Sequence, residues 1–315
     1  IPEMPEFAEY SECRLCPRDC GVDRNAGQVG VCGETARLRY ASVCAHFGEE
    51  PCLSGSRGSG TLFFSGCPCR CFFCQNYQIS RQGAGECHTS DELFQAAQAL
   101  VAGGVHNLNF VTPDHVEPEI RRLCHRLREA GVVVPFVWNG SGYHRAELVP
   151  RWAEYINIFL PDFKFAEPEL ARRCLGDARY PDLALAALRE MVRQRGFLAV
   201  EEAEGAEGAE LAERGVLVRH LVLPGEVANS LAVLDCLHRE FGSELPLSLM
   251  SQFRPVPACH ERQLFTREVT AGEYRRVCDR AQELGFQRLY LQPEAGDAAF
   301  LPDFEKSQPF DGNLR

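Results

Sequence analysis

Apolar runs and amphipathic stretches alternate along most of this chain. Short apolar runs typical of buried strands begin at Leu62, Asn107, Val132, Ile156, Val216 and Leu247. Between and after them, helical periodicity predicts helices at residues 90–102, 117–130, 146–154, 168–174, 183–195, 228–241 and 271–284. Ser90 is interpreted as the N-cap of the first of these helices. The alternation predicts an α/β protein with six β/α repeats and parallel strands.

Three segments depart from this alternation. Residues 38–59 predict a short strand and a loop that leads into the first repeat, and residues 201–215 are an acidic insert expected to be a solvated loop or a frayed helix. After a last short strand at 289–291, the polar ending is expected to lie over the surface. We therefore divide the chain into an N-terminal extension with its lead-in (1–59), a barrel (60–295) and a C-terminal tail (296–315).

Composition limits the possible classes of function. The chain has 315 residues, 45% of them hydrophobic, and a net charge of −11, which argues against a general nucleic-acid-binding surface. We expect no membrane-spanning segment and no signal peptide at residues 1–12. Sixteen cysteines, several at close spacing, favour metal and cluster ligation in a reducing cytoplasm over disulfides.

The densest group of cysteines lies in the stretch 61–80, with the sequence TLFFSGCPCRCFFCQNYQIS. Cys67, Cys71 and Cys74 have the spacing C-x3-C-x2-C, and three thiolates on a [4Fe–4S] cluster leave one iron without a protein ligand. These residues follow a predicted strand, at the end of the sheet where α/β proteins place active sites. Cys69 does not fit this spacing and is interpreted as a non-ligand, with a redox or substrate-side role as the alternative.

A second group of cysteines lies near the N-terminus, spaced C-x2-C-x3-C-x11-C in a glycine-containing segment with no core of its own. We interpret it as a metal-binding extension, with structural zinc as the first hypothesis and an auxiliary iron–sulfur cluster as the second. Its ligands would be Cys13, Cys16, Cys20 and Cys32.

Polar residues follow most of the predicted strands. Because the carboxyl ends of parallel strands meet at one end of a barrel, these residues are expected to converge around the cysteine loop. They are Thr112 to His115, Asn139 to Ser141, Asp162 with Lys164, Arg219 with Pro224 and Gly225, and Ser251, Gln252 and Arg254.

The sequence CPCRCFFC resembles the cluster loop of the radical S-adenosylmethionine (SAM) superfamily. The further motifs CRLCPRDCGV, CFFCQNYQIS, HNLNFVTPDH, LPDFKF, RHLVLPG and MSQFRP, spread over residues 10–300, resemble the PflX-like group of homologues of pyruvate formate-lyase activating enzyme. The resemblance implies a partial (β/α)6 TIM-like radical SAM barrel. It also implies a [4Fe–4S] cluster on Cys67, Cys71 and Cys74, with SAM on the fourth iron and an electron donor such as flavodoxin or ferredoxin.

The resemblance also implies a role for individual residues. Phe73 matches the aromatic residue near adenine, or is a structural residue under the loop. Asp114 stands where relatives hold the SAM amino group, and Asn139 belongs to an Asn-Gly turn of the activases. Asp162 and Lys164 match an Asp-x-Lys motif suited to the methionine end of SAM, with a simple salt bridge as the alternative. Arg219 would meet the SAM carboxylate.

Two departures from the activases lie on the substrate side. Val137-Trp138 replaces their Asp-Thr, which argues against a monovalent-cation site, and Ser251-Gln252 replaces their Tyr-His. The leading hypothesis is thus a radical SAM enzyme that abstracts hydrogen, with either a glycyl-radical enzyme or a small metabolite or peptide as substrate. The alternatives are a non-enzymatic iron–sulfur redox protein and a zinc-stabilised binding module.

Overall fold

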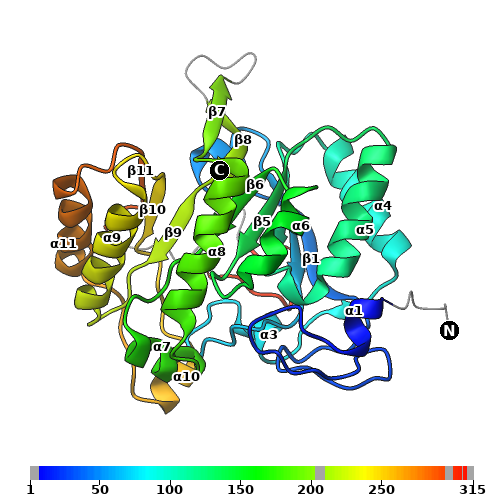
Figure 1. Ribbon diagram of the computed structural model, residues 1–315, viewed down its shortest axis with the longest axis horizontal. Helices are drawn as coiled ribbons and strands as arrows, with labels where there is room; N and C mark the ends of the chain where they lie inside the picture. The colour runs from blue at the N-terminus through cyan, green and yellow to red at the C-terminus, as the bar shows by residue number, and fades with distance from the viewer. Residues whose placement is uncertain (1–6, 203–209, 295–300, 307, 311–315) are drawn as a thin grey trace.

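The computed structural model describes residues 7–294 apart from 203–209, and residues 301–310 apart from 307. These residues form a mixed α/β fold with a large, mainly parallel sheet (Figure 1). The strands are β1 (Arg39–His46), β2 (Ser59–Phe64), β3 (Glu86–Cys87), β4 (Leu108–Val111), β5 (Phe136–Gly140), β6 (Ile158–Pro161), β7 (Ala199–Glu202), β8 (Glu210–Val216), β9 (Val218–Leu221), β10 (Leu247–Met250) and β11 (Leu289–Leu291).

The helices are α1 (Ala8–Ser11), α2 (Pro51–Ser54), α3 (Tyr77–Ser80), α4 (Ser90–Ala102), α5 (Glu117–Glu129), α6 (Val149–Ala153), α7 (Pro168–Leu175), α8 (Tyr180–Arg195), α9 (Val227–Phe241), α10 (Pro257–Glu261) and α11 (Ala271–Glu283). Two short 3-10 helices, η1 (Asp114–Val116) and η2 (Ala146–Leu148), precede α5 and α6. The alternation of strands and helices predicted from periodicity is confirmed, with bounds shifted by a few residues.

The strands form two sheets. One has eight strands in the order β3-β1-β2-β4-β5-β6-β8-β7, and the other has three in the order β11-β10-β9. Strands β2, β4, β5, β6 and β8 are parallel to their neighbours in that series, as are β9, β10 and β11. A single parallel bridge between Asp162 and Arg219 connects the end of β6 to β9. The division into two sheets was not predicted.

Local sequence explains where two of the longest helices begin. Thr89 and Thr270 precede α4 and α11, and each hydroxyl accepts a hydrogen bond from the backbone of a glutamate three residues on, which reciprocates in a capping box. The predicted N-cap Ser90 is therefore wrong by one residue. Its hydroxyl instead donates to Glu119 Oε2 of α5, at 2.8 Å.

The acidic insert is folded in its described parts, contrary to the expected loop or frayed helix. Strands β7 and β8 form an antiparallel hairpin around residues 203–209, which lie outside the described residues. The hairpin is anchored because Gly215 pairs with Ile158 of β6. A Cβ at Gly215, whose φ is 111°, would lie 2.3 Å from Phe197 O, so this close backbone approach requires glycine.

The C-terminal tail lies partly inside the fold rather than only over the surface. Phe304 is buried, and its ring packs edge-on against Phe63 of β2 at a centroid distance of 5.2 Å. Phe310 packs against the same ring at 5.6 Å and against His46 at 4.0 Å. The described tail residues therefore contribute to the wall beside β1 and β2.

The N-terminal segment lies at the same end of the molecule as α3 and α7, opposite the end from which the β7–β8 hairpin projects (Figure 1). Helices α4 and α5 lie on one side in this view, and α9 and α11 on the other. Among the residues that the structure describes, no helix is long and apolar enough to span a membrane.

Candidate functional site

A cavity of about 700 Å³ opens at the carboxyl ends of the parallel strands. Its volume lies within the range of pockets that bind small molecules, roughly 300–1,000 Å³. The loops after β1, β2, β4, β5, β6, β10 and β11 contribute to its wall, together with residues of strand β9, as the sequence predicted for most of them. Its polar and sulfur-bearing lining includes Glu49, Glu50, Cys67, Cys69, Cys71, Cys74, Thr112, Asn139, Asp162, Lys164, Arg219, Gln252 and Gln292.

The cysteine loop follows β2 and lies against this cavity. Cys67, Cys71 and Cys74 all line it, and Cys67 and Cys71 are buried. Gly66 enters the loop at φ 80°, and a Cβ there would lie 2.5 Å from Glu34 Cγ, so the sharp turn after β2 requires glycine. The structure thus brings the three predicted cluster ligands to one wall of the cavity.

Cys69 and Cys71 form a contact that the spacing did not reveal. Their Sγ atoms are 3.4 Å apart, and both residues are buried. The hydrogen bond from Cys69 lowers the pKa of the Cys71 thiol, although burial alone would raise it. The same contact, together with burial, raises the pKa of Cys69 well above its ordinary value. Cys71 is therefore the better thiolate ligand of the two, in keeping with the predicted non-ligand role of Cys69.

Asp162 and Lys164 lie together at the end of β6 and both line the cavity. Their side chains form a salt bridge. Burial disfavours the charged ammonium, but the carboxylate of Asp162 and the sulfur of Cys71 outweigh it, so the pKa of Lys164 is raised well above its ordinary value. A fixed positive charge thus lies beside the cysteine loop.

Arg219 also lines the cavity, but its guanidinium is engaged by the chain itself. Its Nε donates to Glu50 Oε1 at 2.9 Å, and its Nη2 forms ion pairs with both Glu49 and Glu50. Burial would lower the pKa of Arg219, but the two carboxylates raise it above its ordinary value. The predicted contact between Arg219 and the SAM carboxylate stays a prediction; in this structure the guanidinium is paired with the two glutamates. The pattern of residues 38–59 gave no signal for these two glutamates.

Asp114 does not line the cavity, although it follows β4 as predicted. It is fully buried in η1, where its carboxylate forms a pair with Nδ1 of His144, which is also fully buried. Gly142 N donates to His144 Nε2 at 3.2 Å, so Nδ1 carries the proton that Asp114 accepts. The predicted contact of Asp114 with the SAM amino group stays a prediction, and in this structure the carboxylate is buried against His144. Thr112, two residues earlier, reaches the cavity instead.

The remaining predicted residues occupy different places around the site. Phe73 and Asn139 line the cavity, and the Phe73 ring lies edge-on to Phe165, Phe253 and Phe265. Gln252 reaches the cavity and accepts a hydrogen bond from Gln292 Nε2 at 2.6 Å. Arg254 lies outside the cavity lining and forms an ion pair with Glu268.

The N-terminal cysteine segment is hydrogen-bonded to the cysteine loop. Arg18 donates to Pro68 O at 2.8 Å and to Cys69 O at 3.0 Å. Cys67 N donates to Cys32 O at 3.1 Å, which ties the first cluster cysteine to the last cysteine of the N-terminal segment. The two cysteine-rich segments, predicted separately, are therefore in direct contact.

Neither cysteine group is closed around a common point in the described chain. Among the described residues, no three His, Cys, Asp or Glu side chains are grouped so that they could hold a metal ion. This finding applies equally to Cys67, Cys71 and Cys74 and to the four N-terminal cysteines. The donor chemistry nevertheless suits iron–sulfur or zinc binding, because each group is made of thiols in close sequence.

Residues 54–168 match the model of a family described as a 4Fe-4S single cluster domain. This stretch contains all three cysteines of the cluster loop, and the match confirms the [4Fe–4S] cofactor, whereas the assignment of its ligands stays a prediction. An uncharacterized protein of Methanocaldococcus jannaschii is 24% identical over 288 residues, which are 89% of this chain and 77% of that protein.

Solved structures share a more distant similarity with the chain. SuiB of Streptococcus suis bound to S-adenosylmethionine has a TM-score of 0.49 and 11% identity, covering 75% of this chain and 49% of SuiB. This chain therefore corresponds to about half the length of SuiB. Methylornithine synthase (PylB) has a TM-score of 0.44 and 13% identity, covering 78% of this chain and 75% of PylB.

Proposed function

We propose that this protein is a radical SAM enzyme of the PflX-like group. The observation that supports it most is the convergence of the three cysteines of the cluster loop with Lys164 and Phe73 in one cavity. When bound and reduced, the cluster supplies the electron that cleaves SAM to methionine and a 5′-deoxyadenosyl radical, which abstracts hydrogen from a substrate.

In this proposal Cys67, Cys71 and Cys74 hold the cluster, and the side chains around them bind SAM. Lys164 attracts the methionine carboxylate, because its partly buried ammonium lies near Cys71 and stays protonated. Asp162 orients that ammonium through their salt bridge. Phe73, in its aromatic cluster, presents an apolar face suited to adenine. Asn139, which also lines the cavity, provides an amide for hydrogen bonding.

The first test is product formation by anaerobically reconstituted protein given SAM and dithionite. We expect 5′-deoxyadenosine and methionine in equal amounts. A fully cluster-loaded protein that forms no 5′-deoxyadenosine would contradict the proposal and favour a non-enzymatic iron–sulfur redox protein.

The ligand assignment is tested by Cys71→Ala, with Cys87→Ala as the matched control because Cys87 is an exposed cysteine of β3 outside the cavity lining. Cys71→Ala is expected to lose the cluster absorbance and all formation of 5′-deoxyadenosine, whereas Cys87→Ala keeps both. Activity retained in Cys71→Ala would show that another residue, with Cys69 as the nearest thiol, takes its place.

The substrate is proposed by class. A glycyl-radical enzyme, a small metabolite or a peptide would each donate a hydrogen atom to the 5′-deoxyadenosyl radical. Deuterated candidates are expected to transfer deuterium into 5′-deoxyadenosine, as measured by mass spectrometry. The electron donor is proposed to be flavodoxin or ferredoxin, and support of turnover by either in place of dithionite tests that assignment.

A further inference from the structure

We propose that Cys13, Cys16, Cys20 and Cys32 bind one Zn²⁺ as four thiolates, and that the buried Arg24 is the counter-charge of this centre. The inference goes beyond the proposed function because neither SAM nor the [4Fe–4S] cluster takes part in it. It rests on the burial of the sulfurs, on the surroundings of Arg24 and on the position of the segment relative to the cavity.

The four cysteines lie on one short piece of chain, residues 13–32, although their sulfurs are not grouped as metal ligands in this structure. Cys13, Cys16 and Cys32 are buried, and Cys20 is partly buried. A Cβ built on Gly30 would lie 3.3 Å from Cys32 Sγ and 3.6 Å from Cys20 Sγ. These two sulfurs therefore flank one glycine, whose missing side chain leaves the space between them open.

Backbone hydrogen bonds hold the loop that carries the first three cysteines. Cys13 N donates to Val22 O, Gly21 N donates to Cys13 O, both at 3.0 Å, and Asp19 N donates to Cys16 O at 3.1 Å. The buried apolar side chains of this segment form only a small cluster around Tyr10 and Leu15. Such a cluster is too small to order the segment alone, and a bound metal commonly supplies the missing core in segments of this kind.

Arg24 provides the evidence for negative charge at this place. Its side chain is 1% exposed. Its guanidinium donates to His115 O at 2.5 Å and to Thr35 O at 2.7 and 3.1 Å, and it lies 4.1 Å from the centroid of the Tyr10 ring. All these partners are neutral, and no carboxylate in the described part of the chain forms an ion pair with it.

The remaining partner of Arg24 is Cys13, whose Sγ lies 3.8 Å from Arg24 Nη1. Burying a cation is costly even when neutral groups accept its hydrogen bonds, so negative charge on the nearby sulfurs would stabilise this arrangement. Zn²⁺ bound by four thiolates has a net charge of −2, and a guanidinium donating to one of those sulfurs offsets part of it. Cys13 thus has the outer-shell partner that metal ligands usually have.

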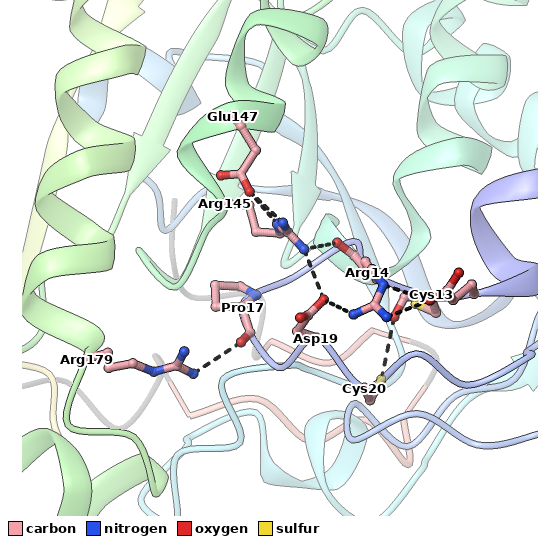
Figure 2. Close-up of polar contacts among 9 residues, drawn as sticks. Cys13, Arg14, Pro17, Asp19, Cys20, Arg145, Glu147 and Arg179 are labelled. Atoms are coloured by element: carbon pink, nitrogen blue, oxygen red, sulfur yellow. Dashed lines mark hydrogen bonds and ion pairs between the residues drawn. The ribbon is translucent and has the colours of Figure 1, made fainter.

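The position of the segment indicates a structural site rather than a catalytic one. None of the four cysteines lines the cavity, so no open coordination position faces a substrate. Figure 2 shows two arginines from later in the chain that hold the segment in place: Arg145 donates to Arg14 O and to Asp19, and Arg179 donates to Pro17 O. Zinc binding would turn the four sulfurs toward one point within this anchored frame.

Metal analysis of the full-length protein tests the proposal directly. The protein is stripped with a chelator and incubated anaerobically with Zn²⁺ alone, and zinc per chain is measured by mass spectrometry. We expect one zinc per chain in the wild type and none in Cys16→Ala.

If Cys16→Ala fails to fold, Co²⁺ titration of the wild type supplies the second measurement. Tetrahedral thiolate ligation gives intense visible absorption, which should be complete with one equivalent of Co²⁺ per chain. A wild type that binds no zinc, or no such cobalt spectrum, would overturn the proposal.

The role of Arg24 is tested by zinc competition with a chromophoric chelator. Arg24→Gln is expected to weaken zinc affinity about 10–100-fold, as loss of an outer-shell partner does. Arg24→Lys, which keeps the charge, should recover part of this loss. Arg14→Gln is the matched control, because Arg14 is an exposed arginine of the same segment paired with Glu12 and Asp19.

Equal zinc affinity in Arg24→Gln and Arg14→Gln would disprove the counter-charge role. Reconstitution with iron and sulfide gives the opposing outcome for the metal itself. If the wild type then binds about four more iron atoms than Cys16→Ala, and the site retains no zinc, the segment holds an auxiliary iron–sulfur cluster instead.

Discussion

Arg18 lies between two cysteines of the N-terminal segment and contacts three parts of the chain. Its guanidinium donates to Pro68 O and Cys69 O in the cluster loop and to Leu175 O at the end of α7, at 2.7–3.0 Å, and it lies 5.0 Å from the centroid of the Tyr143 ring. Arg18 does not line the cavity, so its hydrogen bonds to these carbonyls hold the cluster loop without placing the guanidinium in the cavity wall.

The consequence is that Arg18→Gln should loosen the cluster loop. Hydrogen bonds from charged donors contribute about 1.5–3 kcal/mol, so we expect the substitution to cost about 2 kcal/mol. The measurement is the anaerobic rate at which an iron chelator removes the cluster, expected to rise roughly 30-fold. Arg14→Gln should leave this rate unchanged, and an equal increase in both variants would contradict the specific role of Arg18.

At the residue scale, the sequence predicted what local spacing determines. The three cysteines of the cluster loop are recognisable because C-x3-C-x2-C is itself the ligand pattern. The partners of Asp114 and Arg219 were not predicted, because they lie far away in sequence: His144 is thirty residues beyond Asp114, and Glu49 and Glu50 lie about 170 residues before Arg219. Ion pairs between distant segments have no sequence signal in a single chain.

At the scale of elements, the start of α4 shows how local chemistry sets a boundary. The Thr89 hydroxyl accepts from Glu92 N at 3.1 Å, and the Glu92 carboxylate accepts from Thr89 N at 2.7 Å. Both bonds satisfy backbone donors that the first helical turn leaves free.

Thr89→Ala is expected to lower the free energy of unfolding by about 1 kcal/mol, the usual cost of removing an N-cap hydroxyl. Thr89→Ser keeps the hydroxyl and should lose only a few tenths of that. Urea denaturation of the three proteins measures the difference. Because α4 does not line the cavity, cluster content should be the same in all three; a parallel loss of cluster would show that α4 supports the site.

Periodicity predicted the long elements and failed for the acidic insert. Helices such as α5, α9 and α11 have an apolar face repeated over several turns, which is legible in the sequence. Residues 201–215 have little apolar pattern, and their strand β8 forms because β6 offers it a free edge. Pairing with an available edge is decided by tertiary structure, so local composition did not predict it.

For the whole molecule, two buried histidines make stability depend on pH. Burial lowers the pKa of His115 and that of His220 to about 4. His220 is fixed by Phe163 O at 2.7 Å and by the Ser230 hydroxyl at 2.9 Å, with Asp162 favouring and Lys164 disfavouring its protonation. The unfolded chain therefore binds more protons than the folded chain between pH 6.5 and about 4.

Each histidine has a lower pKa in the folded chain than in the unfolded chain, so it favours folding while it is neutral in both. This contribution to stability is complete above pH 6.5, the pKa in the unfolded chain, and is lost as the pH falls toward 4. Each histidine should contribute a loss of about 2 kcal/mol between pH 7 and pH 5. We expect denaturation of His220→Asn to show a pH-dependent loss about 2 kcal/mol smaller than that of the wild type. His260→Asn, at an exposed position, should behave as the wild type does, and identical pH slopes in all three would contradict this origin.

The sequence by itself determined the α/β class, the alternation of its elements and the two groups of cysteines, because periodicity and ligand spacing act between residues close in the chain. Only the tertiary structure decided which side chains surround the cavity. It paired Arg219 with two glutamates, buried Asp114 against His144 and placed the N-terminal cysteines against the cluster loop. These contacts depend on how distant segments pack. A buried charge is stable only beside a suitable partner, and packing decides which partner lies near it.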